Sequence, residues 1–221
     1  MIRSTIRSYA SLFAGDVNQS RFTPTQYNDA INLGQQQFAL ESLALFKDNT
    51  ITVVDGTATY DLPTDFMLEK EVTHKGLKLD PISRATIQFY ARTTDWTTIT
   101  GTPKYFLIDP EEARKQIRLY PSPLADDAGA NLVLTYYPLP ADLSSDSATP
   151  LNSSVLLVQF HIGIAAYAAW LVLGYEKATP EIVSKRADLY KQYQDKVTEA
   201  RDKFGNTASE PLRLRGGRIW R

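Results

Sequence analysis

The sequence predicts an α+β fold in which a helical bundle, formed by the N- and C-terminal segments, carries an antiparallel β-rich insertion and an extended C-terminal arm. Apolar residues recur with a helical period near both ends of the chain and with a period of two in between. The strand-like runs are short and no helix of about ten residues separates them, which favours antiparallel pairing.

The composition excludes several classes of protein. Of the 221 residues, 43% are apolar and 22% are charged, which is ordinary for a soluble globular protein. The chain has no cysteine, which rules out disulfides, thiolate metal sites and cysteine nucleophiles. Its two histidines, His74 and His161, leave little material for a metal site or a catalytic triad. We therefore expect no enzyme, no metal and no cofactor.

Two helices are predicted before residue 48. Residues 3–14 are expected to form a short helix with Ile6, Tyr9 and Phe13 inward. A second helix begins at Thr23-Pro24-Thr25-Gln26, a capping-box sequence with proline at the first helical position. Its apolar face is marked by Tyr27, Ile31, Gly34, Phe38 and Leu45.

The opposite face of this second helix is polar but uncharged. No charge lies between Asp29 and Glu41, and residues 35–37 are all glutamine. Amides cost less to bury than ions, so this face is either solvated or packed against a partner.

The middle of the chain is expected to form the β-rich insertion. Asp55-Gly56, between two runs of period two, predicts a hairpin, and Lys75-Gly76 predicts a second one. A short helix is expected at 83–90, and further strands are expected at 104–108, 116–120 and 132–137.

The segment 155–174 carries no charge and is long enough to span the roughly 30 Å core of a bilayer. Gln159 and His161 would be unfavourable against lipid, and the small residues around them suit close helix packing. We expect a helix buried in the core or between subunits. The alternative is a small membrane-associated protein anchored by this helix.

The last predicted helix begins at Thr179-Pro180 and stops at Gly205. Its inward face is expected to carry a seven-residue repeat with a second seam beside it, formed by Val183, Tyr190, Val197 and Phe204 and by Tyr193 and Ala200. The predicted domains are therefore a discontinuous helical domain of 1–48 and 151–205, a β-rich insertion of 49–150 and an arm of 206–221.

The charge is distributed unevenly along the chain. Residues 1–210 hold 20 basic and 25 acidic residues, whereas the last eleven hold four arginines and no acid. A basic tail on an acidic body is typical of an arm that binds a partner. The first fifteen residues lack the apolar stretch of a secretory signal, so export is not expected.

The search for catalytic chemistry finds little. The sequence has no phosphate-binding glycine loop, nucleophile elbow or paired-histidine helix. Acidic clusters at 109–112 and 126–127 lie where turns need polar residues. A hydrolytic enzyme that uses Asp109 and Glu112 is the remaining catalytic alternative.

Five segments, taken in order, resemble the head-to-tail adaptor, or connector, proteins of tailed bacteriophages, and especially the tail adaptor of short-tailed phages. The segments are TPTQYNDAIN (23–32), GTATYDLP (56–63), GTPKYFLID (101–109), IRLYPSP (117–123) and LVLTYYPLP (132–140). Two long C-terminal helices follow them. The resemblance covers nearly the whole chain.

The resemblance implies a structural virion protein that forms a ring, commonly of twelve copies, in the neck between head and tail. Such a ring binds the portal on one side and tail or nozzle proteins on the other. It is assembled in the host cytoplasm and has no membrane partner. DNA passes through it during genome ejection without sequence-specific contact.

Two sets of residues are candidate interaction sites. The uncharged helices predict a subunit interface that includes Ala165, Ala166, Ala169, Gln35 and Gln36. The arm predicts a portal-binding site with basic, flexible and apolar residues, namely Arg213, Arg215, Gly216, Gly217, Arg218, Ile219, Trp220 and Arg221.

Overall fold

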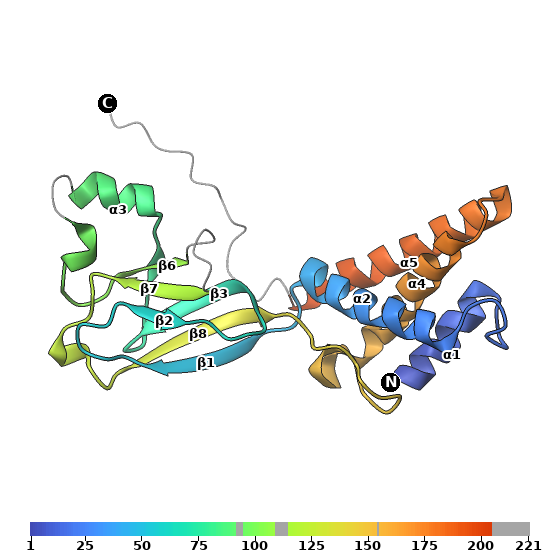
Figure 1. Ribbon diagram of the computed structural model, residues 1–221, viewed down its shortest axis with the longest axis horizontal. Helices are drawn as coiled ribbons and strands as arrows, with labels where there is room; N and C mark the ends of the chain where they lie inside the picture. The colour runs from blue at the N-terminus through green and yellow to red at the C-terminus, as the bar shows by residue number, and fades with distance from the viewer. Residues whose placement is uncertain (92–94, 109–114, 154, 205–221) are drawn as a thin grey trace. The chain divides into compact units, whose positions relative to one another are not determined.

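The computed structural model describes residues 1–91, 95–108, 115–153 and 155–204, and it confirms the α+β fold. The chain divides into two compact units. One unit joins Met1–Ala44 to the chain from Asp142 onward, and the other is Leu45–Ala141 (Figure 1). The predicted arm lies outside the described residues. The connection 142–150, expected in the insertion, instead belongs to the helical unit.

Four α-helices form the helical unit: α1 (Arg3–Ala14), α2 (Pro24–Ser42), α4 (His161–Val172) and α5 (Pro180–Phe204). Short 3-10 helices flank α4 at Leu151–Ser153, Val155–Phe160 and Leu173–Tyr175. The predicted capping box is present at the start of α2. There the backbone N–H of Gln26 donates to Thr23 Oγ1 (3.3 Å), and the N–H of Thr23 donates to Gln26 Oε1 (2.8 Å).

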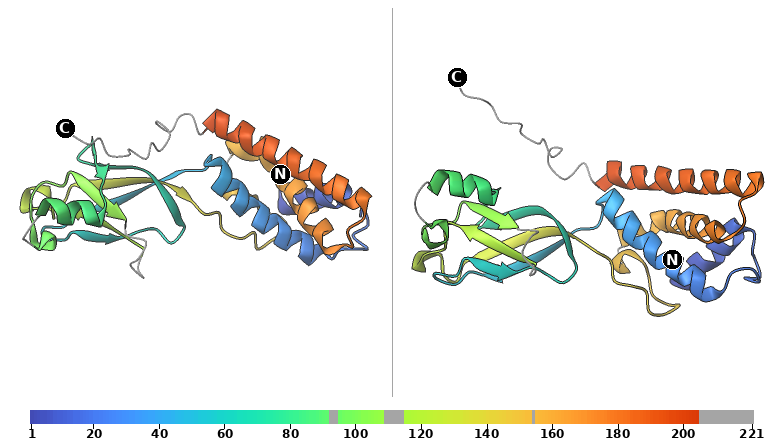
Figure 2. Two further views of the ribbon diagram at one scale, coloured as in Figure 1. Left: turned by 90° about the horizontal axis from the view of Figure 1, so that it is seen from above. Right: turned by 45° about the horizontal axis from the view of Figure 1, so that its top comes forward.

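Helix α4 is the centre of this unit, because it packs against α1, α2 and α5. Both views in Figure 2 show it running beside α5. Two glycines permit the close approach. A Cβ at Gly34 of α2 would lie 3.2 Å from Tyr167 Cδ1, and one at Gly163 would lie 2.9 Å from Lys196 Cβ of α5. The predicted helix 155–174 is thus a shorter α-helix, covered by protein and extended by 3-10 turns.

Aromatic rings join α2, α4 and α5. Phe38 of α2 contacts Phe160 and Tyr193, with ring centroids 5.9 and 6.4 Å apart. Tyr193 also packs against Tyr167, at 4.8 Å. Phe38, Phe160 and Tyr193 are fully buried, so this cluster fixes α5 on the bundle.

The expected inward faces of α5 and α1 need correction. The buried positions of α5 are Leu189, Tyr193, Val197 and Ala200, whereas Val183 and Tyr190 are 55% and 37% exposed. A straight helix drifts by about 20° per seven residues, so the four positions of the repeat spread over about 60° of the helix surface, and the first two lie at the exposed edge of the buried face. In α1, Ile6 is buried as expected but Tyr9 points outward, because Ala10 and Ala14 complete the inner face.

The second unit contains two four-stranded sheets around one apolar core (Figure 1). The strand orders are β1-β8-β3-β4 and β2-β7-β6-β5. Every pairing is antiparallel except β5 with β6. The strands are β1 (Lys47–Thr52), β2 (Thr59–Asp61), β3 (Phe66–His74), β4 (Leu77–Lys78), β5 (Asp80–Pro81), β6 (Tyr105–Ile108), β7 (Gln116–Tyr120) and β8 (Asn131–Pro138), with helix α3 at Arg84–Ala91.

The hairpin predicted at Asp55-Gly56 is wrong, although the turn exists. β1 pairs with β8, and β2 pairs with β7 of the other sheet. Val53 N–H donates to Ala130 O (2.9 Å), and Leu119 N–H donates to Ala58 O (2.8 Å), so residues 53–58 cross between the sheets. The second hairpin, at Lys75-Gly76, is confirmed by the pairing of β3 with β4.

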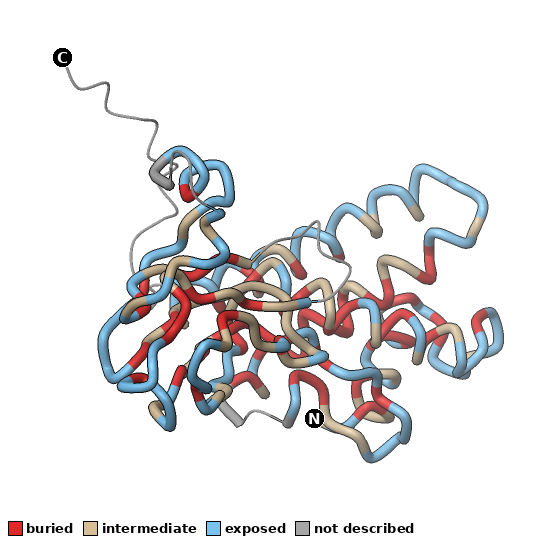
Figure 3. The backbone as a smooth tube through the Cα atoms, turned by 60° about the vertical axis from the view of Figure 1, so that its left-hand side comes forward, coloured by how far each residue is buried: buried red, intermediate tan, exposed pale blue. Residues whose placement is uncertain are grey.

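Buried and exposed residues alternate along α2 and α5, whereas α4 is buried on most sides; Figure 3 colours the backbone by this burial. On α2 the contrast is clear between two similar side chains: Ile31 is fully buried, whereas Leu33, two positions later, is 51% exposed. We predict that Ile31→Ala lowers the free energy of unfolding of the helical unit by about 2 to 5 kcal/mol, because it leaves a cavity in the core.

Leu33→Ala is the matched control, and it should change stability by no more than about 0.5 kcal/mol. Thermal and urea unfolding followed by circular dichroism would measure both variants. Equal losses for the two variants would contradict the assignment of the inner face.

Candidate interaction surfaces

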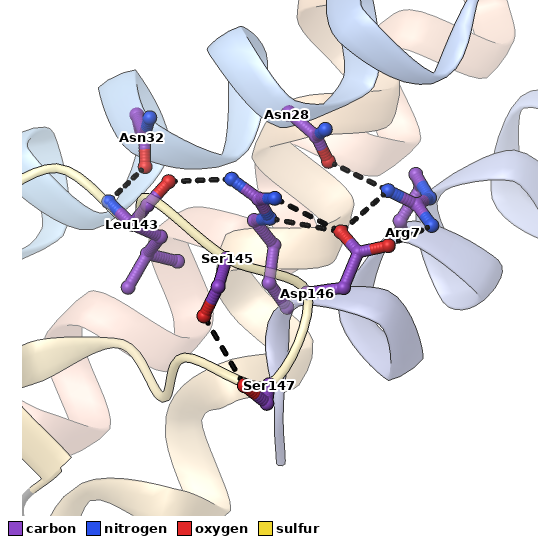
Figure 4. A network of polar contacts seen from close by, with 8 residues as sticks. Arg7, Asn28, Asn32, Leu143, Ser145, Asp146 and Ser147 are labelled. Carbon is purple, nitrogen blue, oxygen red and sulfur yellow. Dashed lines mark hydrogen bonds and ion pairs between the residues drawn. The ribbon is translucent and has the colours of Figure 1, made fainter.

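A network around Asp146 fastens the connection 142–150 to the first helix (Figure 4). Both Arg7 Nη atoms donate to the Asp146 carboxylate at 2.9 Å, one to each oxygen. Arg3 donates to the same carboxylate from Nε (3.2 Å) and Nη2 (2.9 Å). Arg3 Nη1 also donates to the backbone oxygen of Leu143. We call this set, Arg3, Arg7 and Asp146, the Asp146 clamp.

Helix α2 and the backbone extend the clamp. Asn28 Oδ1 accepts from Arg7 (3.0 Å), and Asn32 Oδ1 accepts from the N–H of Leu143 (2.9 Å). The N–H groups of Arg3 and Ser4 donate to the oxygens of Ala148 (2.8 Å) and Asp146 (3.1 Å). The connection therefore bonds to both N-terminal helices.

The charges of the clamp set its pH dependence. Hydrogen bonds from Arg7 and Arg3 hold the pKa of Asp146 below its ordinary value. A carboxyl whose pKa is lower in the folded state adds stability above its unfolded pKa, which is about 4. That contribution is lost as the pH falls through the lower, folded-state value.

The α1–α2 loop is organised by a second carboxylate, that of the buried Asp16. It accepts N–H bonds from Ser20, Arg21 and Phe22 at 2.9 to 3.1 Å and a hydroxyl bond from Tyr27. Burial raises the pKa of Asp16, but the backbone bonds outweigh burial and the pKa is lowered overall. The loop thus holds a buried, ionised carboxylate next to the α2 N-terminus.

The structure places the predicted interface residues inside the helical unit or against it. Ala165, Ala166, Ala169 and Gln35 are fully buried within the chain, so they offer no surface to a second copy in this conformation. Gln35 Oε1 accepts from the N–H of Leu151 (3.2 Å). Gln36 is half-buried and its Nε2 donates to Asp142 Oδ1 (2.9 Å).

Two other sets of residues form uncharged surfaces on the helical unit. The first, which we call the α1 groove, is a shallow hollow lined by Ser4, Thr5, Ser8, Tyr9 and Leu12. The second, the α2 ridge, consists of Leu33 and Leu40, each 51% exposed. The apolar positions that predict the core do not reveal either surface. The sequence gives one indication of the α2 ridge: Leu33 and Leu40 are seven residues apart and do not belong to the predicted core face.

We searched the part of the chain that the structure describes for clusters of side chains that could bind a metal ion or act in catalysis. It contains no group of three or more His, Asp or Glu side chains able to hold a metal ion. Buried Asp127 contacts His74 Nε2 (3.3 Å) and Lys75 Nζ (2.7 Å), which ties the β3–β4 turn to a neighbouring loop. Asp109 and Glu112 lie outside the described residues, as do all eight residues of the predicted arm site.

One segment, Leu157–Tyr175, is long and apolar enough to cross a membrane by length and composition. In its most apolar window, 61% of the residues are buried within the structure. Core helices of soluble proteins pass the same test. The packing of α4 against three other helices favours a core helix over the membrane anchor.

Comparison with known proteins identifies one family. The family model described as SU10 adaptor protein matches residues 2–215, nearly the whole chain. A comparison with curated proteins finds none that matches the sequence.

The clamp makes a prediction that hydrogen exchange can test. Asp146→Asn removes the charge that both arginines share, so the amides of Arg3 and Ser4 should lose protection. Asp142→Asn is the control, because it keeps an oxygen for the one bond from Gln36. In the unmodified protein the same two amides should lose protection as the pH falls below about 4. Unchanged protection in Asp146→Asn would show that the clamp does not hold the connection.

Proposed function

Because the chain belongs to the SU10 adaptor protein family, we propose that it joins the portal ring of the phage head to the tail as an oligomeric ring of twelve copies. The observation that carries this proposal is the family match over residues 2–215. The family itself makes the chain a structural adaptor of a bacteriophage. Portal binding, the ring and its copy number are our extension of that role.

The architecture supports an adaptor between different partners. Each of the two units has its own buried core, so each can keep its shape while it binds a separate protein. The described residues offer uncharged helical surfaces rather than a cluster of catalytic side chains. Binding without turnover is the function that these features favour.

The proposed partners are the portal ring on one side and tail or nozzle proteins on the other. In the neck of the virion the ring would surround the path of the DNA during genome ejection. The body of the chain is acidic overall, which suits passage of DNA without sequence-specific binding. Assembly would take place in the host cytoplasm.

The arm of 206–221 is the proposed portal-binding element. It carries Arg213, Arg215, Arg218 and Arg221 for pairing with acidic groups, and Ile219 and Trp220 as an apolar anchor. Gly216 and Gly217 between them allow the backbone to bend. Sixteen residues reach about 50 Å when extended, far enough to enter a groove on the neighbouring ring. Aromatic and arginine anchors usually dominate the energy of such contacts.

Deletion of residues 212–221 tests the arm directly. The truncated protein should keep its circular dichroism spectrum and melting temperature, because the deletion leaves both described cores intact, but it should not cosediment with the portal ring. Trp220→Ala alone should cause much of this defect. Trp96→Ala, a change in the insertion, is the control and should leave docking intact. Undiminished docking by the truncated protein would refute the role of the arm.

A further inference from the structure

The two uncharged surfaces of the helical unit differ in shape. The α1 groove is a hollow edged by small hydroxyl side chains, with Tyr9 and Leu12 as its apolar part. The α2 ridge projects two leucines that are seven residues, or about 10.5 Å, apart along the helix. A spacing of seven is that of knobs which enter the holes of a facing helix. The α2 ridge projects and the α1 groove is recessed, so the leucines of the ridge can enter the groove.

Few charges lie near these surfaces, although the exposed Asp29 lies one helical turn before Leu33. On α1 the charged side chains are Arg3 and Arg7, which are only 11% and 16% exposed because they face Asp146. On α2 no charge occurs between Asp29 and Glu41, and Gln36 and Gln37 are bonded to Asp142 and Glu41. Depletion of charge around exposed aromatic and aliphatic side chains is typical of the core of a protein interface.

Symmetry indicates which partner fits. Identical copies that close into a ring contact each other head to tail, so each copy needs two different surfaces that match. A two-fold dimer needs a single surface that matches itself. This helical unit carries two unlike, uncharged surfaces on two helices, which is the requirement of a ring.

We propose that the α2 ridge of one copy packs into the α1 groove of the next copy and forms the subunit contact of the adaptor ring. The proposal rests on the ring adaptor function proposed above and names the surfaces that build the ring. It replaces the predicted interface residues Ala165, Ala166, Ala169 and Gln35, which are buried inside each copy.

The absence of cysteine permits a direct test by cross-linking. The samples are Leu12→Cys, Leu33→Cys and the double variant, each oxidised with copper phenanthroline to form disulfides after reconstitution with the portal ring of the same phage. Arg7 contacts Asn28 and Asp16 contacts Tyr27, so Leu12 and Leu33 lie on opposite sides of the first of these contacts. Each lies five residues, or about 7.5 Å along its own helix, from that contact, so a disulfide within one copy, which needs Cα atoms within about 7 Å, is not expected.

A head-to-tail contact predicts a distinct product for each sample. The double variant should give a ladder of covalent multimers, whereas the two single variants mixed together should give only dimers that contain one copy of each. Each single variant alone should give almost none. Leu77→Cys is the matched control, because Leu77 is an exposed leucine of the insertion, and its pair with Leu12→Cys should give no ladder.

A charge placed on either surface should have the same effect on assembly. Leu33→Lys and Leu12→Lys should fold normally but reduce the number of adaptor copies on the portal by at least tenfold, and Leu77→Lys should not. Dimers from either single cysteine variant alone would indicate a two-fold contact and would overturn the proposal. Full rings without cross-links at these positions would overturn it but leave the ring function intact. No association of copies, with or without the portal, would refute both.

Discussion

The helical unit depends on the burial of α4 on nearly every side. An apolar helix without any charge cannot face water, and α4 meets this constraint by packing against three helices drawn from both ends of the chain. α1 and α2 precede the β-rich unit in sequence, and α5 follows α4. The bundle is therefore complete only when the two chain ends meet, with the insertion between them. Gly34 and Gly163 are points of close approach: a Cβ at Gly163 would clash with Lys196, and one at Gly34 would crowd Tyr167.

The bundle closes only if the connection 142–150, which follows the β-rich unit, is fixed against the N-terminal helices. The Asp146 clamp fixes it there. The connection 142–150 has no regular secondary structure of its own before Leu151. Its position comes from one carboxylate shared by two arginines and from backbone bonds to the first turn of α1. The clamp has a second effect, because it draws both arginines of α1 toward the connection. The outer face of that helix is then free of charge, and the same interaction that closes the unit shapes the surface proposed for assembly.

Local signals in the sequence were sufficient for most elements, and long-range contacts account for what was missed. The capping box of Thr23 and Gln26, the turn at Lys75-Gly76 and the apolar segment containing α4 are encoded within a few residues, so they could be predicted. The partner of β1 could not, since Asp55-Gly56 specifies a turn but not which sheet the chain enters next. Arg3 and Asp146 are separated by 143 positions, and no spacing rule connects them. The burial of the predicted interface residues has a related explanation: a lack of charge indicates that Ala165 and Ala169 are covered, but not whether the cover comes from the same chain.

Uncharged residues have two different roles in the helical unit, depending on whether the chain itself covers them. Residues that lack charge and are buried within the chain stabilise one copy, whereas residues that lack charge and remain exposed are left for a partner. On α2 both kinds alternate, with Ile31 and Phe38 inward and Leu33 and Leu40 outward. One helix can thus belong to the core of its own unit and to a contact with another copy. Because α1 has the same two-sided character, a small bundle can present a ridge and a groove without any additional element.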